Sequence, residues 1–339
     1  MTGFLNDKAV ERLRSVGALP EFSGTRYVLM DFLARGGMGT VYAAQDKTLN
    51  RRVAIKVLDS SDPRNALEER LLREARVLAQ LEHPGVVPVH DAGTLADGRV
   101  FYVMKFVEGS RVDQFLDNES SLFERLRLFL RICETVSFAH SRGILHRDLK
   151  PSNVMVGAFG EVLVMDWGLA KILQPDSAGC FEETVGSSEP LCTGVTGNSE
   201  TQITSATEDG VILGTPGFMS PEQAQGKSSS LDARTDIFSL GKLLEAILKQ
   251  AKSTTAVRVP RALRAICQKA AAESLSGRYA SVSELAEDIS RYLDGMPVWA
   301  YRENLWERAQ RFYTRYQAAI LLITAYLLMR AIFVFFGRH

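Results

Sequence analysis

This 339-residue sequence has zero net charge, only four cysteines and no apolar N-terminus. Lys and Arg number 40, as do Asp and Glu, so overall positive charge does not favour a nucleic-acid binder, and we expect no nucleic-acid partner. The four cysteines are scattered without a C-x-x-C pair, so the sequence indicates neither a disulfide scaffold nor a zinc site. Residues 1–17 are polar and charged, which argues against a secretory signal peptide. We therefore expect the bulk of the protein in the cytosol.

The apolar content is sufficient for a folded core, and its pattern changes along the chain. Apolar residues make up 46% and charged residues 24%, which excludes a disordered or fibrous chain. Strand-like patterns occupy Tyr27 to Val57 and 100–107, whereas helical periodicity dominates after residue 122. The expected helices are 64–81, 122–141, 231–250, 261–273 and 281–294. We expect a small strand-rich lobe followed by a larger helical lobe, with a short amphipathic helix inside 1–22.

Residues 172–213 differ in composition from the rest of the chain. They contain eleven Ser or Thr, seven Asp or Glu and no Lys or Arg, and they show no helix or strand period. A structureless stretch of this length is uncommon inside a compact domain. We therefore expect it to be mobile or functional rather than part of the core.

A lysine that ends an apolar strand and a glutamate on an apolar helix face are expected to meet. Lys56 ends the strand VAIK, and Glu74 lies on the leucine stripe of the helix at 64–81. Each charge is costly to bury unless an opposite charge meets it. Taken alone, Glu74 would more simply point to water; the presence of Lys56 favours a buried ion pair.

The turn ARGGMGTVY lies between the first two expected strands. Because they lack a Cβ, Gly36, Gly37 and Gly39 let backbone N–H groups approach an anion closely. Glycine-rich hairpins are common, so the turn alone is weak evidence. Lys56 follows on the next strand, which favours a phosphate cradle with a lysine beside it.

Two further segments place polar groups between apolar anchors. In ILHRDLKPSNVMV (144–156) the proline argues against a helix, so a loop should hold the polar residues. These polar residues are His146, Arg147, Asp148, Lys150 and Asn153. EVLVMDWG (161–168) is an apolar strand that ends at Asp166, an acid placed to suit oxygen ligation of Mg²⁺.

Together these motifs, in this order and spacing, resemble the eukaryotic-type protein kinase family, and specifically its bacterial Ser/Thr branch. The resemblance extends from about Tyr27 to Asp294. It implies an α+β, two-lobed protein kinase fold with a small β-rich N-lobe and a large α-helical C-lobe. The implied segments are an N-terminal extension at 1–22, the N-lobe at 23–107 and the C-lobe at 108–296, with an extended activation-loop insertion at 172–213.

The resemblance implies ATP and Mg²⁺ as cofactors and gives the motif residues their roles. Lys56 would hold the α- and β-phosphates and pair with Glu74. Asp148 would accept the proton of the substrate hydroxyl, and Lys150 would neutralise the γ-phosphate. The residues implied to hold Mg²⁺ are Asn153 and Asp166. The residues implied to bind ATP are Leu33, Gly36, Gly37, Gly39, Val41, Ala54, Lys56, Met104, Val107 and Met155, with Met104 as the gatekeeper.

The segment GTPGFMSPE resembles the substrate-binding end of the activation segment. Thr215 and Lys150 together favour proteins bearing Ser or Thr as substrates. Glu222 and Arg278 match a buried pair that braces this segment, and Asp236 matches an anchor of the catalytic loop. The alternative for Asp236 is a helix N-terminal charge favoured by the macrodipole.

The sequence departs from the family pattern at three places. Ala34 replaces the first glycine of the nucleotide loop, which we interpret as tuning rather than loss. Trp167 stands where the family usually has Phe, an aromatic exchange that we expect to be tolerated. Only twelve residues separate Ile247 from Pro260, where relatives usually have an additional docking helix, so peptide docking is expected to differ.

Arg147, directly before Asp148, resembles an arginine that often binds a phosphate on the activation segment. We expect autophosphorylation of one or more threonines in 172–213, since phosphate would give this cation-free loop a partner. The regulatory set is Arg147, Thr193, Thr196, Thr201, Thr204, Thr207 and Thr215. The alternative is an inert, solvated insertion.

The C-terminal segment 318–336 is apolar on every face apart from Thr324, Tyr326 and Arg330. Its length of about 28 Å is close to the hydrocarbon thickness, which predicts a single-pass transmembrane helix after a juxtamembrane segment at 297–317. Arginines and aromatic residues precede it, which predicts a cell-membrane protein with the kinase domain on the cytoplasmic side. The alternatives are an in-plane interfacial helix and a buried helix that packs on the lobe.

We thus expect a Mg·ATP-dependent Ser/Thr protein kinase in membrane-anchored signalling, with activation-loop autophosphorylation. A homodimer would suit phosphorylation between two copies. The alternatives are a nucleotide-binding scaffold that signals by conformation and a kinase of small molecules, the latter disfavoured by GTPGFMSPE.

Overall fold

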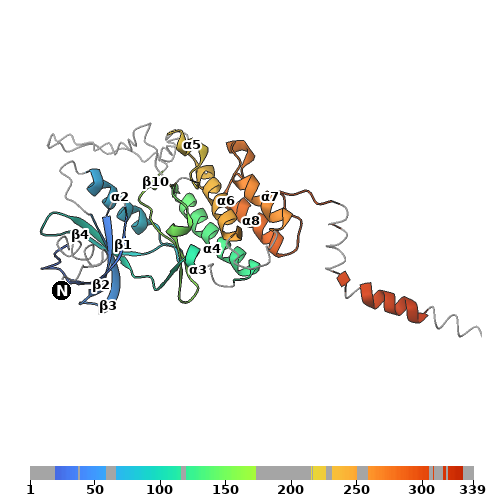
Figure 1. Ribbon diagram of the computed structural model, residues 1–339, viewed down its shortest axis with the longest axis horizontal. Helices are drawn as coiled ribbons and strands as arrows, with labels where there is room; N and C mark the ends of the chain where they lie inside the picture. The colour runs from blue at the N-terminus through green and yellow to red at the C-terminus, as the bar shows by residue number, and fades with distance from the viewer. Residues whose placement is uncertain are drawn as a thin grey trace, which may run out of the picture.

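The structure is a computed structural model that describes residues 20–36, 39–58, 66–115, 120–172, 215, 217–226, 231–249, 259–304, 308, 316–317 and 320–330. A strand-rich lobe precedes a helical lobe, and an isolated helix lies beyond them towards the C-terminus (Figure 1). The helix expected inside 1–22 falls on residues 1–19, outside the described residues, and so does 173–214.

The first lobe is one antiparallel sheet with a helix on one face. Its strand order is β1-β2-β3-β5-β4. The strands are β1 (Tyr27–Arg35), β2 (Gly39–Asp46), β3 (Arg51–Leu58), β4 (Val89–Thr94) and β5 (Val100–Lys105), and the helix is α2 (Ala66–Gln80). Residues 53–58 of β3 are all buried because both faces of the sheet are covered.

Alternation along β3 decides which face each side chain joins. Val53, Ile55 and Val57 belong to a cluster with Phe22 on one face, while Ala54 and Leu58 belong to the cluster that contains α2. Successive side chains of a strand point to opposite faces. Lys56 therefore points towards α2.

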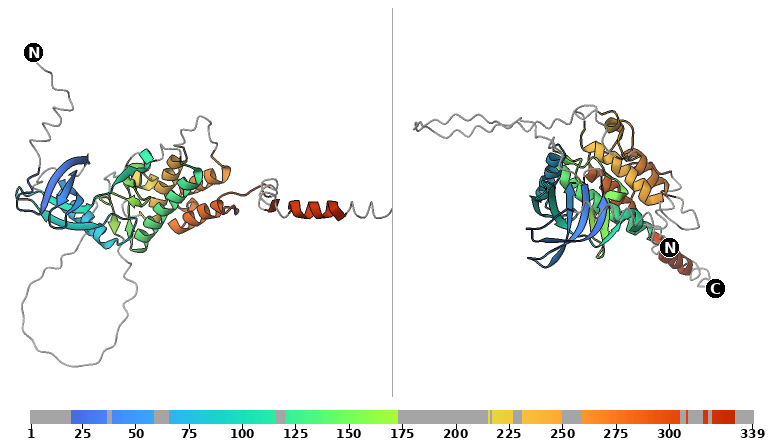
Figure 2. Two further views of the ribbon diagram at one scale, coloured as in Figure 1. Left: turned by 90° about the horizontal axis from the view of Figure 1, so that it is seen from below. Right: turned by 60° about the vertical axis from the view of Figure 1, so that its left-hand side comes forward.

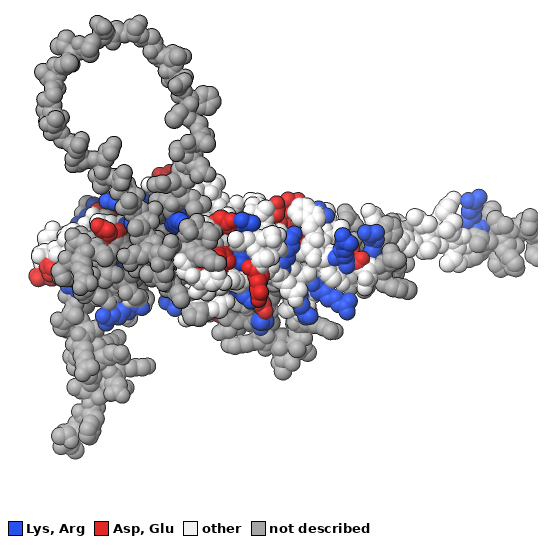
Figure 3. All heavy atoms as spheres, turned by 90° about the horizontal axis from the view of Figure 1, so that it is seen from above, with Lys and Arg blue, Asp and Glu red and all other residues white. Residues whose placement is uncertain are grey.

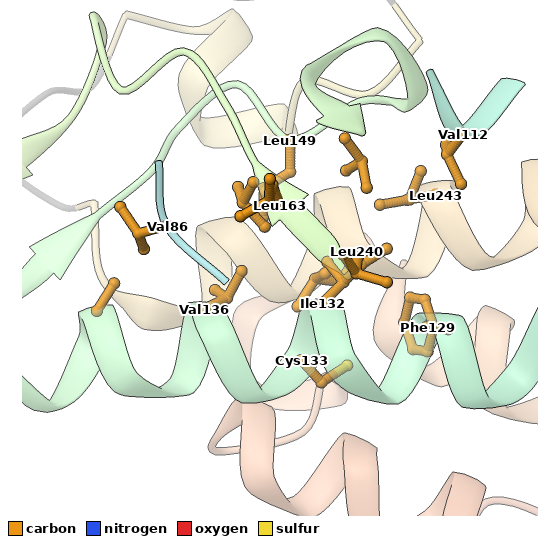
Figure 4. Packing of buried hydrophobic residues seen from close by; sticks show 14 of the residues in the cluster. Val86, Val112, Phe129, Ile132, Cys133, Val136, Leu149, Leu163, Leu240 and Leu243 are labelled. Carbon is orange, nitrogen blue, oxygen red and sulfur yellow. The ribbon is translucent and has the colours of Figure 1, made fainter. Parts of the chain in front are cut away.

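In the residues that the structure describes, the second lobe is built on four long helices. They are α4 (Leu122–Ser141), α6 (Ala233–Lys249), α7 (Arg261–Ala270) and α8 (Val282–Leu293), accompanied by the single-turn helices α3 (Val112–Phe115) and α5 (Pro221–Ala224). Helix α4 begins at a capping box in which Ser121 and Glu124 satisfy each other's backbone N–H groups. Ile132 of α4, Leu163 and Leu240 of α6 meet in its core (Figure 4).

Short strands lie between the lobes and hold the polar loops. β6 (Gly109–Arg111), β8 (Val154–Gly157) and β9 (Val162–Val164) form one sheet, and β7 (Ile144–Leu145) pairs with β10 (Lys171–Ile172). The 3-10 turns are η1 (Pro151–Asn153) and η3 (Leu275–Gly277). An isolated bridge from Val86 to Val164 joins the first lobe to this layer.

The expected helices after residue 60 are confirmed within a few residues, but two expected strands are shorter. The strand at 100–107 ends at Lys105, and the strand at 161–168 is only Val162–Val164. The second shortening has a backbone cause, because Asp166 has φ of 59° and leaves the extended region.

The expected transmembrane helix at 318–336 is not found in the described part of the chain. Residues 320–330 form a helix whose side chains are almost all exposed, whereas 318–319 and 331–336 lie outside the described residues. These eleven helical residues extend about 17 Å, roughly half of a bilayer core. Within the described ranges, no helix has the length and apolar character needed to cross a membrane.

Candidate active site

A buried ion pair joins the sheet of the first lobe to α2. Lys56 Nζ lies 2.8 Å and 2.7 Å from the two carboxylate oxygens of Glu74. Tyr102 on the adjacent strand β5 donates its hydroxyl to the same carboxylate at 2.9 Å. Both partners of the pair are almost fully buried, so each depends on the other for its charge.

Electrostatics keep Lys56 protonated in spite of its burial. Burial alone would lower the pKa of Lys56, but Glu74 and then Asp166 outweigh it and raise the pKa above the ordinary value. Burial, followed by the charge of Glu74, raises the pKa of Tyr102 well above its usual value, so the phenol stays a hydrogen-bond donor. The site thus presents a permanent cation.

Asp166 brings a carboxylate from the second lobe to the same cation. Its Oδ1 lies 3.6 Å from Lys56 Nζ, and its side chain is 45% exposed, so it remains accessible. The left-handed backbone at Asp166, rare for a residue with a Cβ, turns it out of β9. Lys56, Glu74 and Asp166, which are distant in sequence, therefore converge on one point.

The loop before β8 holds a second cluster of hydrogen-bonded groups. Lys150 Nζ lies 2.7 Å from Asp148 Oδ2 and 2.6 Å from Thr215 Oγ1. Thr215 donates its hydroxyl to Asp148 Oδ1 at 3.0 Å. Asn153 donates its amide to the backbone oxygen of Asp148 at 2.9 Å and to Oδ2 at 3.1 Å. The carboxylate of Asp148 is thus fixed by a cation, an amide and a hydroxyl.

A fully buried carboxylate on α6 supports this loop from below. Asp236 accepts backbone N–H groups of His146 and Arg147 at 2.8 Å each, and His140 Nε2 lies 2.7 Å from it. Burial would raise the pKa of Asp236, but the hydrogen bond with His140 and the further contacts outweigh it and lower the pKa. Arg147 has φ of 70°, and these bonds hold its strained backbone.

An aromatic pair connects this loop to the segment after β9. The rings of His146 and Trp167 have centroids 4.6 Å apart, and His146 Nε2 lies 3.0 Å from the carbonyl oxygen of Met165. Trp167 donates its indole N–H to the carbonyl of Val164 at 3.1 Å. Trp167 is 1% exposed, and its buried indole N–H has a hydrogen-bond acceptor. A tryptophan at this position therefore leaves no buried N–H unpaired.

The strands of the first lobe place the residues expected to line the nucleotide site next to these polar groups. Ala54 pairs with Met104 across β3 and β5, and Val41 pairs with Lys56 across β2 and β3. A Cβ at Gly39 would lie 2.2 Å from the carbonyl oxygen of Val57, so only glycine fits there.

The remaining candidate residues of the nucleotide site differ in exposure. Met104 is buried, Val41, Val107 and Met155 are half-buried, and Leu33 is exposed. Gly36 donates its N–H to the carbonyl of Gly39 at 2.9 Å and so closes the turn, while Gly37 lies outside the described residues.

The donor set of the site fits Mg²⁺. Asn153 uses its amide nitrogen for hydrogen bonds, which leaves its oxygen as an acceptor, and Asp166 supplies an accessible carboxylate. Mg²⁺ commonly takes one or two protein oxygens and completes its shell with water and phosphate oxygens. No group of three or more His, Cys, Asp or Glu side chains able to hold a metal occurs among the described residues.

A second buried ion pair braces the segment after Thr215. Arg278 donates to both oxygens of Glu222, at 2.7 Å and 2.9 Å, and to three backbone carbonyls. Burial would raise the pKa of Glu222, but the hydrogen bonds from Arg278 outweigh it and lower the pKa. Gln223 donates its amide to the carbonyl of Arg147 at 2.8 Å, which ties this segment to the loop that contains Asp148.

Arg147 is buried without a hydrogen-bond partner for its Nε among the described residues. Burial lowers the pKa of its guanidinium. Of the threonines predicted to regulate the site, Thr215 lies against Asp148. The others lie outside the described residues, namely Thr193, Thr196, Thr201, Thr204 and Thr207.

Three supporting residues had no signal in the sequence. Tyr102 lies in an apolar strand like its neighbours, His140 lies near the end of α4 just before the motif at 144–156, and Gln223 lies on α5 directly after GTPGFMSPE. Their roles follow only from the structure. Tyr102 bonds to Glu74, His140 to Asp236 and Gln223 to the carbonyl of Arg147, and these contacts join segments that are distant in sequence.

Comparison with known proteins agrees with this geometry. A model of the protein kinase domain matches residues 27–296. The serine/threonine-protein kinase PknD of Chlamydia trachomatis serovar D is 33% identical, with 87% of this chain and 34% of the relative covered. PknD of Chlamydia felis is 36% identical over 81% of this chain and 32% of the relative. The chain belongs to the protein kinase family, and its likeness to the bacterial Ser/Thr branch is confirmed.

The chain spans about one third of the length of these curated relatives. The crystal structure of the PknI kinase domain of Mycobacterium tuberculosis superposes with a TM-score of 0.54 at 23% identity, covering 79% of this chain and 96% of that chain. This likeness confirms the two-lobed fold.

Proposed function

We propose that this protein transfers the γ-phosphate of Mg·ATP to Ser or Thr hydroxyls of proteins. The observation that carries the proposal is the convergence of Lys56, Glu74 and Asp166, since a cation held between two carboxylates from different lobes suits a phosphate–metal complex. Bound Mg·ATP would supply the phosphoryl group, and the metal would neutralise its charge. Lys56 would orient the phosphates, with Asn153 and Asp166 as oxygen donors to the metal.

The second cluster suits the acceptor hydroxyl. Asp148 already accepts a hydrogen bond from the Thr215 hydroxyl, and its carboxylate is held by Lys150 and Asn153. An acceptor hydroxyl that reaches Asp148 would donate its proton to this carboxylate as the phosphoryl group arrives. Lys150 would offset the negative charge that develops there.

Activation-segment phosphorylation is a further part of the proposal. Arg147 is buried with an unpartnered Nε in the described part of the chain, and the sequence of 172–213 contains many hydroxyls and no cation. A phosphate on one of its threonines would give Arg147 a charge-assisted partner. Phosphorylation between two copies would suit this step.

We also propose that the protein associates with the cell membrane through 318–336, with the kinase domain on the cytoplasmic side. The support is the apolar sequence of that segment and the arginines that precede it. A kinase domain held there would phosphorylate substrates on the cytoplasmic side of the membrane.

The test is transfer of labelled phosphate from ATP to a generic Ser/Thr acceptor protein, with Asp166→Asn as the variant. An enzyme should lose transfer in the variant, since Asn lacks the charge that holds the metal. Glu287→Gln, at an exposed carboxylate on α8 in the second lobe, serves as the control that should keep full activity. A protein that binds ATP but transfers no phosphate in either form would instead be a nucleotide-binding scaffold.

A further inference from the structure

The side chain of Gln223 lies between the segment after Thr215 and the loop that contains Asp148. It is buried, and both ends of its amide make hydrogen bonds. Its Oε1 accepts from the backbone N–H and from the hydroxyl of Ser220, each at 3.1 Å. Its Nε2 donates to the carbonyl oxygen of Arg147 at 2.8 Å, 76 residues away in the sequence. Gln223 is therefore a neutral link between two distant segments of the chain.

The carbonyl that Gln223 holds belongs to the peptide unit that leads into Asp148. The N–H of the same peptide unit, from Asp148, donates to His146 Nδ1 at 3.3 Å. Both polar atoms of this peptide unit are thus bonded, one to a residue of its own loop and one to α5. Because a peptide unit is planar, its rotation would break both bonds together and change the direction of the Asp148 side chain.

Arg147 depends on such support because its backbone lies in the left-handed region, with φ of 70°. A residue with a Cβ keeps this conformation only where the surrounding contacts determine it. Asp236 of α6 accepts the backbone N–H of Arg147 at 2.8 Å, and Gln223 binds the carbonyl of the same residue. The strained residue next to Asp148 is therefore held from α6 and from α5 at once.

The segment that carries Gln223 is itself fixed in the second lobe. Besides the buried ion pair described above, Ser239 of α6 donates its hydroxyl to the carbonyl of Phe218 at 2.8 Å. In both views of Figure 2 the yellow segment with α5 and the start of α6 lies against the green segment that contains the Asp148 loop. Thr215, just before this segment, donates its hydroxyl to the Asp148 carboxylate. This part of the chain thus reaches Asp148 at its carboxylate and, through Gln223, at its backbone.

We infer that Gln223 is a positioning residue for phosphate transfer, which places the Asp148 carboxylate by holding the carbonyl of Arg147. The inference rests on the proposed function, because it assigns Gln223 a role in that reaction. Asp148 would direct the acceptor hydroxyl, so a small shift of its carboxylate should lower the rate of transfer. In the described part of the chain, the Gln223 side chain bonds to Ser220 and Arg147 and not to the residues proposed to hold ATP. Binding of ATP should therefore not depend on it.

A capping role alone would not require glutamine at this position. Ser220 and Gln223 form a capping box at the start of α5, and glutamate serves equally in such a box, as Glu124 does at the start of α4. Only the amide can also donate to a carbonyl, since an ionised carboxylate has no proton to give. Figure 3 shows charges of both signs at the surface of the second lobe, where water solvates them, whereas Gln223 is only 4% exposed. A neutral donor suits this buried position better than a charge.

The test is steady-state phosphate transfer from ATP to a generic Ser/Thr acceptor protein by the full chain, with kcat taken per ATP-binding site. Gln223→Glu keeps an acceptor for the capping box and loses the donor, whereas Gln223→Met loses both without adding a charge. We expect each variant to lower kcat roughly tenfold, the effect of one hydrogen bond near the upper end of its usual contribution. KM for ATP should stay unchanged, because the lost contact acts on the transfer step.

Hydrogen exchange gives a second measurement that does not depend on catalysis. The backbone amides of 146–148 should exchange roughly tenfold faster in both variants, because the peptide unit before Asp148 is no longer held from α5. The matched control is Glu124→Met, which removes the corresponding side chain from the capping box of α4, at an exposed position about 24 Å along the helix from His140. It should lower the thermal midpoint and alter neither kcat nor exchange at 146–148.

Wild-type kcat in Gln223→Glu would show that only the cap matters and would overturn the inference. A higher KM for ATP at unchanged kcat, or unchanged exchange at 146–148 in both variants, would overturn it as well. A wild-type chain that transfers no phosphate would refute the proposed function and, with it, the role of Gln223 in transfer. Faster exchange at 146–148 in the two variants would in that case still establish that Gln223 holds the backbone at Asp148.

Discussion

The buried pair between Glu222 and Arg278 should be among the most sensitive points of the fold. Arg278 Nη1 and Nη2 lie 2.7 Å and 2.9 Å from the Glu222 oxygens. The Arg278 side chain is 0% exposed and the Glu222 side chain 9% exposed. Removal of one partner leaves the other charge buried, which typically costs about 3–5 kcal/mol. The two partners differ, however, in what else supports them.

Glu222→Gln should lower the free energy of unfolding by about 3 kcal/mol, the low end of that range. Its amide oxygen still accepts from Arg278, which also donates to the carbonyls of Ala272, Arg234 and Glu273. Arg278→Met should lower the free energy of unfolding by about 5 kcal/mol, because it leaves the buried Glu222 carboxylate without its cation and those three carbonyls without their donor. The contacts therefore predict that Arg278→Met destabilises the fold more than Glu222→Gln.

Urea unfolding of the full chain, followed by tryptophan fluorescence, measures the free energy of unfolding of each variant. Glu108→Gln is the control, since its pair with Arg52 is exposed on both sides and should contribute at most about 1 kcal/mol. A loss on Glu222→Gln equal to that of the control, or larger than the loss on Arg278→Met, would refute the reasoning.

The same pair predicts a pH dependence. Because the folded pKa of Glu222 lies below its ordinary value of 4.5, its contribution to stability is present above pH 4.5 and is lost as the pH falls through the folded value. The stability gap between wild type and Glu222→Gln should therefore narrow at acid pH. A gap that widens below pH 4.5 would show that the pair does not hold a charged carboxylate.

Three further outcomes are expected. Gly39→Ala should weaken ATP binding in a fluorescence titration and lower the thermal midpoint, because its Cβ would clash with the β3 backbone. Gly36→Ala is the control and should be tolerated, because a Cβ at Gly36 meets nothing closer than 3.8 Å. Equal effects of the two substitutions would contradict the packing argument. Tyr102→Phe removes one hydrogen bond to the charged Glu74, so unfolding should become easier by about 1.5–3 kcal/mol with phosphate transfer reduced rather than abolished, and unchanged stability would speak against that bond. Deletion of 318–336 should move the protein from the membrane to the soluble fraction on centrifugation, and equal distribution with the intact chain would remove the case for anchoring.

Local sequence signals predicted the helices better than the strands. Helix α4 begins where Ser121 and Glu124 form a capping box, and its apolar period continues to the end, so both bounds could be expected. The strand at 161–168 was expected to include Asp166, because its apolar run continues through Met165. The structure ends it at Val164, since the backbone of Asp166 turns into the left-handed region, which no periodicity reveals.

The candidate site was predictable where charge is costly and unpredictable where support comes from across the fold. Lys56 and Glu74 stood out because each would be expensive to bury alone, and burial does force them together. Tyr102 did not stand out, since a tyrosine in an apolar strand needs no explanation until its hydroxyl is seen on Glu74. Gln223 likewise gains its meaning only from the carbonyl of Arg147.

The supporting contacts also limit where regulation can act. Displacement of α2 would separate Glu74 from both Lys56 and Tyr102, and would leave Lys56 with only Asp166 at 3.6 Å and the buried Tyr102 hydroxyl without its acceptor. Arg147 is different, because its guanidinium is buried with an unpartnered Nε among the described residues while its backbone is fixed by Asp236. A new anionic partner for Arg147 would satisfy that donor without breaking a contact described here. On these contacts, a phosphate on the activation segment would act more readily through Arg147 than through movement of α2.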